Sequence, residues 1–516
     1  MKSTKILACL LTLALLLASM ASIPSAVLAE EAPLEIRLSY SDNPTLPFNP
    51  DWLAIKEAEK LTNTKLSFEV IPNTDWTEKI RAMLNSGTAP DALLYVNASS
   101  TLAEFGINGA LLPVNQYMEQ FPSWNALIEQ WGMKDDVAQR YLVDGNLYYI
   151  PELFDFPFYD AGMVIRTDLL EKYGLEVPTT FDELYEVAKV FKENFPDSYP
   201  LTNLVDQRVT YRMTMPSFGV SLGLNAANGS HVTSYDYENK TTFAGATSDL
   251  YKDYLIWLSK MYAEGLYDPE FVNASDVWAT KLSTGAAQIT YAYYDQLGGL
   301  VANSTIEGIA FNQFAPLQGP IGAYHQPKSR TGNGIAFPTT TLTKYGEDKT
   351  KAIMSALDKM FFSPEGSELW CLGVEGVTFT RDAAGDVIFN DEILASPDGP
   401  YKAMQLLYGC GTAPLQLVWE NAREMYKYDE YYGELNKKVA DMGGIQPVPP
   451  SPKLDQDETE EVNFIKAPLV DLFDKWTNDF IRGTKSLDTD WAAYVAEMED
   501  AGINDLVDYY NLGLSR

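Results

Sequence analysis

Residues 144–184 read DGNLYYIPELFDFPFYDAGMVIRTDLLEKYGLEVPTTFDEL, and they predict how the chain passes between two lobes. The segment begins with a turn at residues 144–146, because Asp, Gly and Asn tolerate left-handed backbone and bond their own main chain. Residues 147–150, rich in Tyr and Ile, predict a short strand. Pro151 and Pro157 then interrupt regular structure. We therefore expect residues 152–159 to form an irregular crossing from one lobe to the next.

The second half of this segment predicts one strand and two helices in the new lobe. Residues 162–165 are apolar, as in a buried strand. Thr167 and Asp168 are expected to cap a helix that ends at Gly174. Thr180 is the expected N-cap of the following helix, with Glu183 completing a capping box three residues later.

The N-terminal part of the chain shows the same alternation of strands and helices. Residues 34–40 and 65–71 alternate apolar and polar side chains and predict strands. Residues 52–62 and 75–84 predict amphipathic helices, and a third apolar run reaches Tyr95. This β-α-β-α-β order predicts a doubly wound α/β sheet.

Length and composition limit the class of protein. A chain of 516 residues exceeds what one hydrophobic core usually holds, so at least two lobes are expected. The hydrophobic content of 46% excludes a disordered chain. The net charge of −33 argues against nucleic acid or an anionic membrane surface as a partner, since both need a basic patch.

Residues 1–29 predict a signal peptide. Lys2 and Lys5 supply its positive charge, residues 6–18 its apolar segment, and residues 27–29 (VLA) a small-residue cleavage site. We expect an exported chain that is soluble after cleavage, because no later apolar run reaches about 18 residues. Cys9 lies at the start of the apolar segment and not after it, so lipid anchoring stays open.

Cysteine and histidine are scarce in the rest of the chain. Cys371 and Cys410 could form one disulfide or remain two buried thiols. With two histidines in the whole chain, a zinc site is not expected.

Several motifs resemble one protein family and occur in the order found there. Together with residues 144–184 they span nearly all of the chain after residue 29, and the resemblance is to extracellular solute-binding proteins of carbohydrate ABC transporters, including the lipoprotein-type oligosaccharide binders. The further motifs are MLNSGTAPD (83–91), GALLPVNQY (109–117), YAEGLYDPEF (262–271), LWCLGVEGVT (369–378) and the C-terminal run 473–516.

The resemblance implies an α/β fold with two lobes, of the type II periplasmic-binding-protein kind, joined by about three crossings. We expect the crossings near residues 152–160, 310–317 and 364–378. The first lobe would then comprise residues 30–155 and 313–366. The second lobe would comprise 156–312 and 367–516, including the C-terminal helices. Ligand is expected in the cleft between lobes, beyond the carboxyl ends of strands.

Candidate ligand-binding residues in the first part of the chain follow from strand ends. Aromatic residues make up 12% of the chain, and flat rings match the apolar face of a sugar. Tyr95 ends the third strand and Asn97 follows it; at this strand end the resembling maltodextrin-binding proteins stack a residue on sugar. Asp42 follows the first strand, and Tyr159 lies at the first crossing. The alternative roles are core packing for Tyr95, a turn for Asp42 and hinge packing for Tyr159.

Further candidates lie in the expected second lobe. Arg212, next to Tyr211, could clamp a hydroxyl pair or a uronate carboxylate, or form a surface salt bridge. Tyr293 and Tyr294 follow a strand that resembles one preceding a ligand-facing aromatic in the family. Trp370 and Trp419 are candidates near the third crossing. Trp278 is expected in the core.

No metal or cofactor is expected. Some members of the family bind calcium in an acidic loop after the helix that begins at Thr180. In this chain the loop reads NFPDSYP (194–200), without the alternating acids that calcium needs.

The function predicted from these observations is substrate binding without turnover. We expect the substrate-binding component of an ABC importer, a monomer that captures an oligosaccharide and delivers it to a membrane permease. A peptide or other small solute is the alternative ligand. A secreted glycosidase or lyase, or an adhesin, is less favoured, because no nucleophile elbow, P-loop or zinc motif occurs in the sequence.

Overall fold

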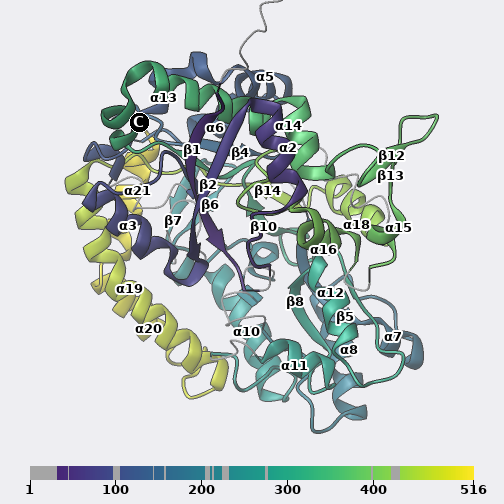
Figure 1. Cartoon of the computed structure of the whole chain (residues 1–516). Coiled ribbons are helices and arrows are strands. Elements are labelled where there is room, and N and C mark those ends of the chain that lie inside the picture. Colours follow the sequence, from purple (N-terminus) through teal and green to yellow (C-terminus); the bar gives the residue numbers. More distant parts are fainter. Residues whose placement is uncertain are drawn as a thin grey trace, which may run out of the picture.

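Figure 1 shows the computed structural model as two groups of helices and strands, one above the other. Helices α2 (Leu53–Thr62), α13 (Thr339–Phe362) and α14 (Pro364–Leu372) lie in the upper group, and α8 (Phe181–Asn194), α10 (Asp249–Ala263) and α11 (Trp278–Ser283) in the lower group. The structure describes residues 32–44, 46–96, 105–142, 144–155, 159–203, 210–211, 214–222, 232–272, 277–396, 399–419 and 430–516.

The first lobe contains the predicted β-α-β-α-β unit. Strand β1 (Leu34–Asp42) pairs in parallel with β2 (Thr64–Pro72), and Leu38 also bridges Ala92, just before β3 (Leu93–Val96). Helices α2 and α3 (Trp76–Ser86) connect these strands, which confirms the prediction. Strand β11 (Thr331–Ala336) then pairs antiparallel with both β3 and β4 (Ile150–Leu153).

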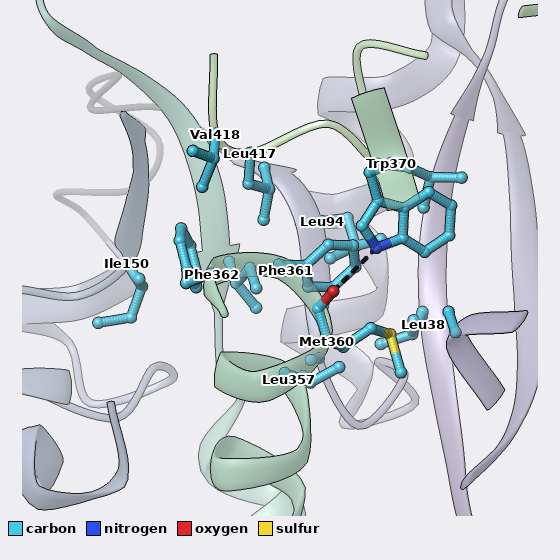
Figure 2. Packing of buried hydrophobic residues seen from close by; sticks show 14 of the residues in the cluster. Leu38, Leu94, Ile150, Leu357, Met360, Phe361, Phe362, Trp370, Leu417 and Val418 are labelled. Atoms are coloured by element: carbon cyan, nitrogen blue, oxygen red, sulfur yellow. Dashed lines mark hydrogen bonds between the residues drawn. The ribbon is translucent and has the colours of Figure 1, made fainter. Parts of the chain in front are cut away.

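The core of the first lobe joins segments that are far apart in the sequence. Its buried residues come from positions 36–153 and 335–418. In Figure 2 the indole of Trp370 lies beside Phe361, with ring centroids 5.5 Å apart, and its Nε1 donates to the carbonyl oxygen of Met360 at 3.1 Å. Leu417 and Val418 complete the same cluster.

The second lobe is built on a smaller antiparallel sheet. Strand β5 (Ala161–Arg166) lies between β8 (Ile289–Tyr293) and β9 (Phe311–Gln313). Residues 161–317 and 462–510 supply its main core. The chain therefore ends in this lobe, through α19 (Gln456–Arg482), α20 (Trp491–Asp500) and α21 (Ile503–Leu514).

Between the lobes, β10 (His325–Lys328) pairs in parallel with β14 (Ile445–Pro447). The hydroxyl of Tyr159 donates to the carbonyl oxygen of Phe314 at 2.7 Å, and its ring packs against His325 with centroids 5.0 Å apart. Lys328 forms an ion pair with Asp160. These contacts hold the crossing segments together, so we call this region the hinge.

The crossings expected near residues 310–317 and 364–378 are wrong, because each of these segments packs within one lobe. Residues 310–317 belong to the second lobe, because Phe311, Phe314 and Leu317 are buried there. Residues 367–419 belong to the first lobe, because Trp370 and Val418 lie in its core. The expected lobe boundaries at residues 312/313 and 366/367 therefore do not match the packing.

Local predictions around residues 144–184 are mostly confirmed. Thr180 caps α8 with a capping box that includes Glu183. The predicted cap of α7 (Thr167–Tyr173) is wrong, because Asp168 accepts a hydrogen bond from Arg166 Nε at 2.7 Å instead. The strand predicted at residues 147–150 is misplaced, because residues 147–149 form no strand and β4 begins at Ile150 and includes Pro151. This is allowed because β4 is an edge strand of its sheet.

The signal peptide predicted at residues 1–29 lies outside the described residues. Within the described ranges, every helix is too short or too polar to cross a membrane. The remaining elements named in Figure 1 are α5 (Pro122–Trp131), α6 (Lys134–Ala138), β6 (Ser234–Asp236), β7 (Thr241–Phe243), α12 (Leu297–Ala302), β12 (Phe379–Arg381), β13 (Val387–Phe389), α15 (Asp391–Leu394), α16 (Pro400–Ala403) and α18 (Glu430–Asp441).

Candidate functional site

A cavity of about 640 Å³ lies between the two lobes, and we call it the inter-lobe cavity. Its walls come from three parts of the chain: the strand ends of the first lobe, helices α11 and α12 of the second lobe, and residues 402–414. Its volume is in the range typical of small-molecule sites.

The first wall forms where parallel strands end. Tyr40, Ser41 and Asn43 lie at the carboxyl end of β1, and Asn73 directly follows β2. Because β1 and β2 are parallel, their carboxyl ends meet at the same edge of the sheet. This edge is where ligands of open α/β sheets bind.

Tyr95 on β3 completes the first wall. Its φ of 60° is left-handed, which few residues other than glycine adopt. The ring packs edge-on against Trp76, with centroids 6.3 Å apart, and the side chain bonds that of Asn333 on β11. Burial raises the pKa of the Tyr95 hydroxyl, so the hydroxyl stays neutral.

The second wall is presented by α11 and α12. Trp278, Thr280 and Ser283 line the cavity from α11. Lys281 fixes this helix, because its Nζ lies 2.6 Å from Asp268 Oδ2 and 2.7 Å from Glu270 Oε2. The positive charge of Lys281 is therefore already neutralised.

The third wall is a segment anchored on α2. The indole Nε1 of Trp52 donates to the carbonyl oxygen of Leu406 at 3.1 Å. Gly409, with a φ of 76°, lies so close that a Cβ would meet the Trp52 ring at 2.6 Å. Gln405 Nε2 donates to the carbonyl oxygen of Gly411 at 2.8 Å. These contacts bring Lys402 and Gln405 to the cavity.

The lining combines aromatic rings with neutral hydrogen-bonding groups. Lys402 is its only charged member among the described residues, and no carboxylate belongs to it, although the chain carries a net charge of −33. The aromatic members are Tyr40, Tyr95 and Trp278, and the neutral polar members are Ser41, Asn43, Asn73, Thr280, Ser283, Gln296, Asn303, Gln405 and Thr412.

A buried carboxyl group lies behind Tyr95. Glu152 on β4 is 6% exposed and accepts from the backbone N–H of Asn333 at 2.8 Å and from Trp419 Nε1 at 3.3 Å. Burial raises the pKa of Glu152 to about 8. Asn333 therefore hydrogen-bonds Glu152 through its backbone N–H and Tyr95 through its side chain. It links the cavity wall to β4, the strand that leads into the hinge.

Comparison with known sequences assigns the family. The family model described as "Bacterial extracellular solute-binding protein" matches residues 50–348, which is more than half of the chain.

The chain belongs to the bacterial extracellular solute-binding proteins.

Two curated proteins illustrate the relatives of this solute-binding protein. One is the polygalacturonan/rhamnogalacturonan-binding protein YtcQ of Bacillus subtilis, 27% identical over 64% of each chain. The other is the fructooligosaccharide ABC transporter substrate-binding protein FusA of Streptococcus pneumoniae, 22% identical over 91% of this chain and 88% of FusA. The chain spans less than two thirds of the length of YtcQ and of a Bacillus subtilis lipoprotein that it also matches, 64% and 60% respectively.

Solved structures show the same fold. The alginate-binding protein AlgQ2 superimposes with a TM-score of 0.71 and covers 94% of this chain and 99% of its own, at 20% identity. This solute-binding protein therefore has the predicted two-lobe α/β fold.

Of the residues predicted to bind ligand, Tyr95 lines the inter-lobe cavity. Asp42 lies between the lining residues Ser41 and Asn43, but its carboxylate accepts from the backbone N–H of Phe48 at 2.8 Å, as in the turn alternative. Asn97 and Arg212 lie outside the described residues.

Three predicted residues are buried in packing and do not reach the cavity. Tyr159 lies in the hinge and is 2% exposed. Tyr211 is buried in the second-lobe core, with its ring centroid 6.0 Å from that of Tyr254. Trp370 is buried in the first-lobe core. Their rings are covered because core and hinge need large apolar side chains as well.

The other three lie near the hinge, outside the cavity lining. Tyr293 is 43% exposed at the end of β8. Tyr294 packs on Tyr432 of α18, with ring centroids 3.9 Å apart. Trp419 stacks on Phe154 at 5.3 Å. A role in ligand contact stays a prediction for each of them.

Sequence reasoning missed most of the lining. Asn73 could have been found, because it follows β2 just as Asn43 follows β1. Trp278 was expected in the core, and it does pack partly against the main second-lobe core and against a smaller second-lobe cluster that includes Leu282 and Leu300. Lys402 was missed because its segment reaches the cavity through a contact with Trp52, far away in the sequence.

Other predictions concern thiols and metals. Cys371 and Cys410 are buried thiols and form no disulfide with each other. In the loop predicted not to bind calcium, Lys192 Nζ donates to the carbonyl oxygen of Ser198 at 2.7 Å. Among the described residues, no three Asp, Glu, His or Cys side chains gather as a metal site would require. The absence of calcium stays a prediction.

Proposed function

We propose that this protein is the substrate-binding component of an ABC importer, which captures an extracellular oligosaccharide in the inter-lobe cavity and delivers it to a membrane permease. One observation carries the proposal: Tyr95 and Trp278 enter one cavity from different lobes, with neutral hydrogen-bonding side chains around them. A sugar offers an apolar ring face and a polar hydroxyl edge, and this lining matches both.

The relatives support the ligand class. YtcQ, FusA and AlgQ2 are each named for a carbohydrate ligand, and FusA also for an ABC transporter. The named carbohydrates include both acidic and neutral ones, so these names leave the charge of the ligand open. Export by residues 1–29 and a monomeric state are part of the same proposal.

Binding without turnover is favoured over hydrolysis. A glycosidase needs two carboxyl groups flanking the scissile bond, and the described lining of the cavity contributes none. Closure of the two lobes would bury the sugar and create the surface that a permease recognises.

The test is calorimetry with a panel of oligosaccharides and peptides, combined with mass spectrometry of the recovered ligand. We expect one class of oligosaccharide to bind at a 1:1 ratio and to be recovered unchanged. Binding of peptides alone would establish the alternative solute class. Release of shorter sugars would show an enzyme instead.

A further inference from the structure

The inter-lobe cavity differs in charge from the rest of the molecule. The chain has 71 acidic and 38 basic side chains, so an average surface presents an excess of carboxylates. The described residues of the cavity lining include one lysine and no acid. This local reversal of charge requires an explanation in terms of the ligand.

Lys402 is the origin of the reversal. It lies half-buried on α16, in the wall formed by residues 402–414. Among the described residues it has no hydrogen-bond or ion-pair partner, whereas Lys281 on α11, outside the lining, contacts two carboxylates. The positive charge of Lys402 is therefore available to whatever enters the cavity.

We infer that the ligand is an acidic oligosaccharide, and that Lys402 binds its anionic group. The inference rests on the proposed function. An anion approaching a chain of net charge −33 is repelled at long range, so its binding requires a site from which acids are removed and to which a cation is added. A neutral sugar requires neither feature.

The single charge also limits the kind of group. One ammonium matches one singly charged group, such as the carboxylate of a uronic acid or a sulfate ester. Lysine acts as a point charge without the planar fork of arginine, so it does not by itself select carboxylate over sulfate. Gln405 and Thr412 lie on the same wall and can hydrogen-bond the neighbouring hydroxyls.

The experiment compares three ligands by calorimetry: trigalacturonate, its fully methyl-esterified form, and a neutral trisaccharide with one sulfate ester. The proteins are the wild type, Lys402→Gln and the control Lys60→Gln. Lys60 is 71% exposed on α2, outside the cavity lining. Methyl esterification removes the charge and keeps the sugar ring, so it isolates the contribution of Lys402.

We expect the wild type and Lys60→Gln to bind at least one of the two acidic ligands about ten- to a hundredfold more tightly than the uncharged methyl ester. We expect Lys402→Gln to lose that preference. The stronger of the two acidic ligands identifies carboxylate or sulfate. Raising NaCl from 50 to 500 mM should reduce the preference in the wild type.

The other outcomes separate this inference from the proposed function. Equal affinity for acid and ester, or for neutral sugars only, would overturn the inference and leave oligosaccharide binding intact. A preference for acid that survives in Lys402→Gln would overturn the role of Lys402. Failure of every saccharide in the wider panel would contradict the proposed function itself.

Discussion

Tyr95 and Trp278 contribute aromatic rings to the same cavity under different constraints. Tyr95 is held in left-handed backbone by its strand neighbours, and such a conformation costs on the order of 1 kcal/mol in a non-glycine residue. Trp278 packs partly against both second-lobe clusters and also reaches the cavity. The tyrosine is therefore fixed in position, and the tryptophan lies on the helix that lobe closure would move.

Replacing Trp278 by alanine should weaken oligosaccharide binding at least about tenfold, because stacking on a large ring is lost. Calorimetry measures the affinity. Trp131→Ala is the matched control, since Trp131 is half-buried in the first lobe and outside the cavity lining. Unchanged affinity in a folded Trp278→Ala protein would remove this residue from the site.

Glu152 should make stability depend on pH. Its folded pKa of about 8 lies above the ordinary value of 4.5, so between these two values the folded state holds a proton that the unfolded state releases. Stability from this group is therefore complete below pH 4.5 and is lost as pH rises toward 8. The loss is at most about 1.4 kcal/mol per pH unit.

Glu152→Gln keeps the shape of the side chain and removes the titration. We expect urea unfolding at pH 5, 6, 7 and 8 to show the wild type losing stability relative to Glu152→Gln as pH rises. The difference between the two proteins cancels every other titrating group. A constant difference across this range would show that Glu152 does not change its protonation there.

At the scale of elements, local signals in the sequence predicted local structure well. The capping box of Thr180 and Glu183 and the strand–helix alternation of residues 34–95 involve neighbours in the chain, so they can be read from the sequence. The placement of residues 367–419 depends on distant contacts such as the hydrogen bond from Trp52 to Leu406, within a core that also includes residues 36–153. No local pattern carries that information.

The candidate site was predictable only in part for the same reason. Tyr95 was found because it lies near the end of a strand. Lys402 and Thr412 reach the cavity through a segment that Trp52 anchors from the other end of the chain. The aromatic residues Tyr211 and Trp370, which pack in the two cores and do not line the cavity, are of the same types as those that do, and no local pattern separates the two groups.

Close packing of β11 on β4 provides a test at this scale. Gly334 on β11 lies against the backbone of β4, where an added Cβ would lie 2.7 Å from the Cα of Pro151. Because backbone cannot move aside easily, Gly334→Ala should lower the free energy of unfolding by about 2 kcal/mol or more.

Gly433 on α18 is the matched control. It is exposed in a helix, and a Cβ there would meet nothing within 4 Å. Gly433→Ala should therefore raise stability by about 0.5–1 kcal/mol. Urea denaturation of both variants measures the contrast, and equal stabilities would contradict the packing of β11 on β4.

At the scale of the molecule, two cores share one hinge. The first-lobe and second-lobe cores are separate clusters, and β10, β14 and Tyr159 lie between them. Each lobe can therefore move as a body while the hinge adjusts a few backbone angles. The inter-lobe cavity draws its walls from both lobes, so such a motion changes the cavity directly.

Ligand binding should therefore make the whole protein more compact. A ligand that contacts Tyr95 on the first lobe and Trp278 on the second favours the closed arrangement by its extra contacts there. Small-angle X-ray scattering with a saturating oligosaccharide should show a smaller radius of gyration than without it. The Trp278→Ala protein, at ligand concentrations that saturate it, should show a smaller decrease because it lacks one of the two bridging rings. An unchanged radius in the saturated wild type would mean that the lobes are already closed or do not move, and binding would then have to be signalled to a permease without a change in shape.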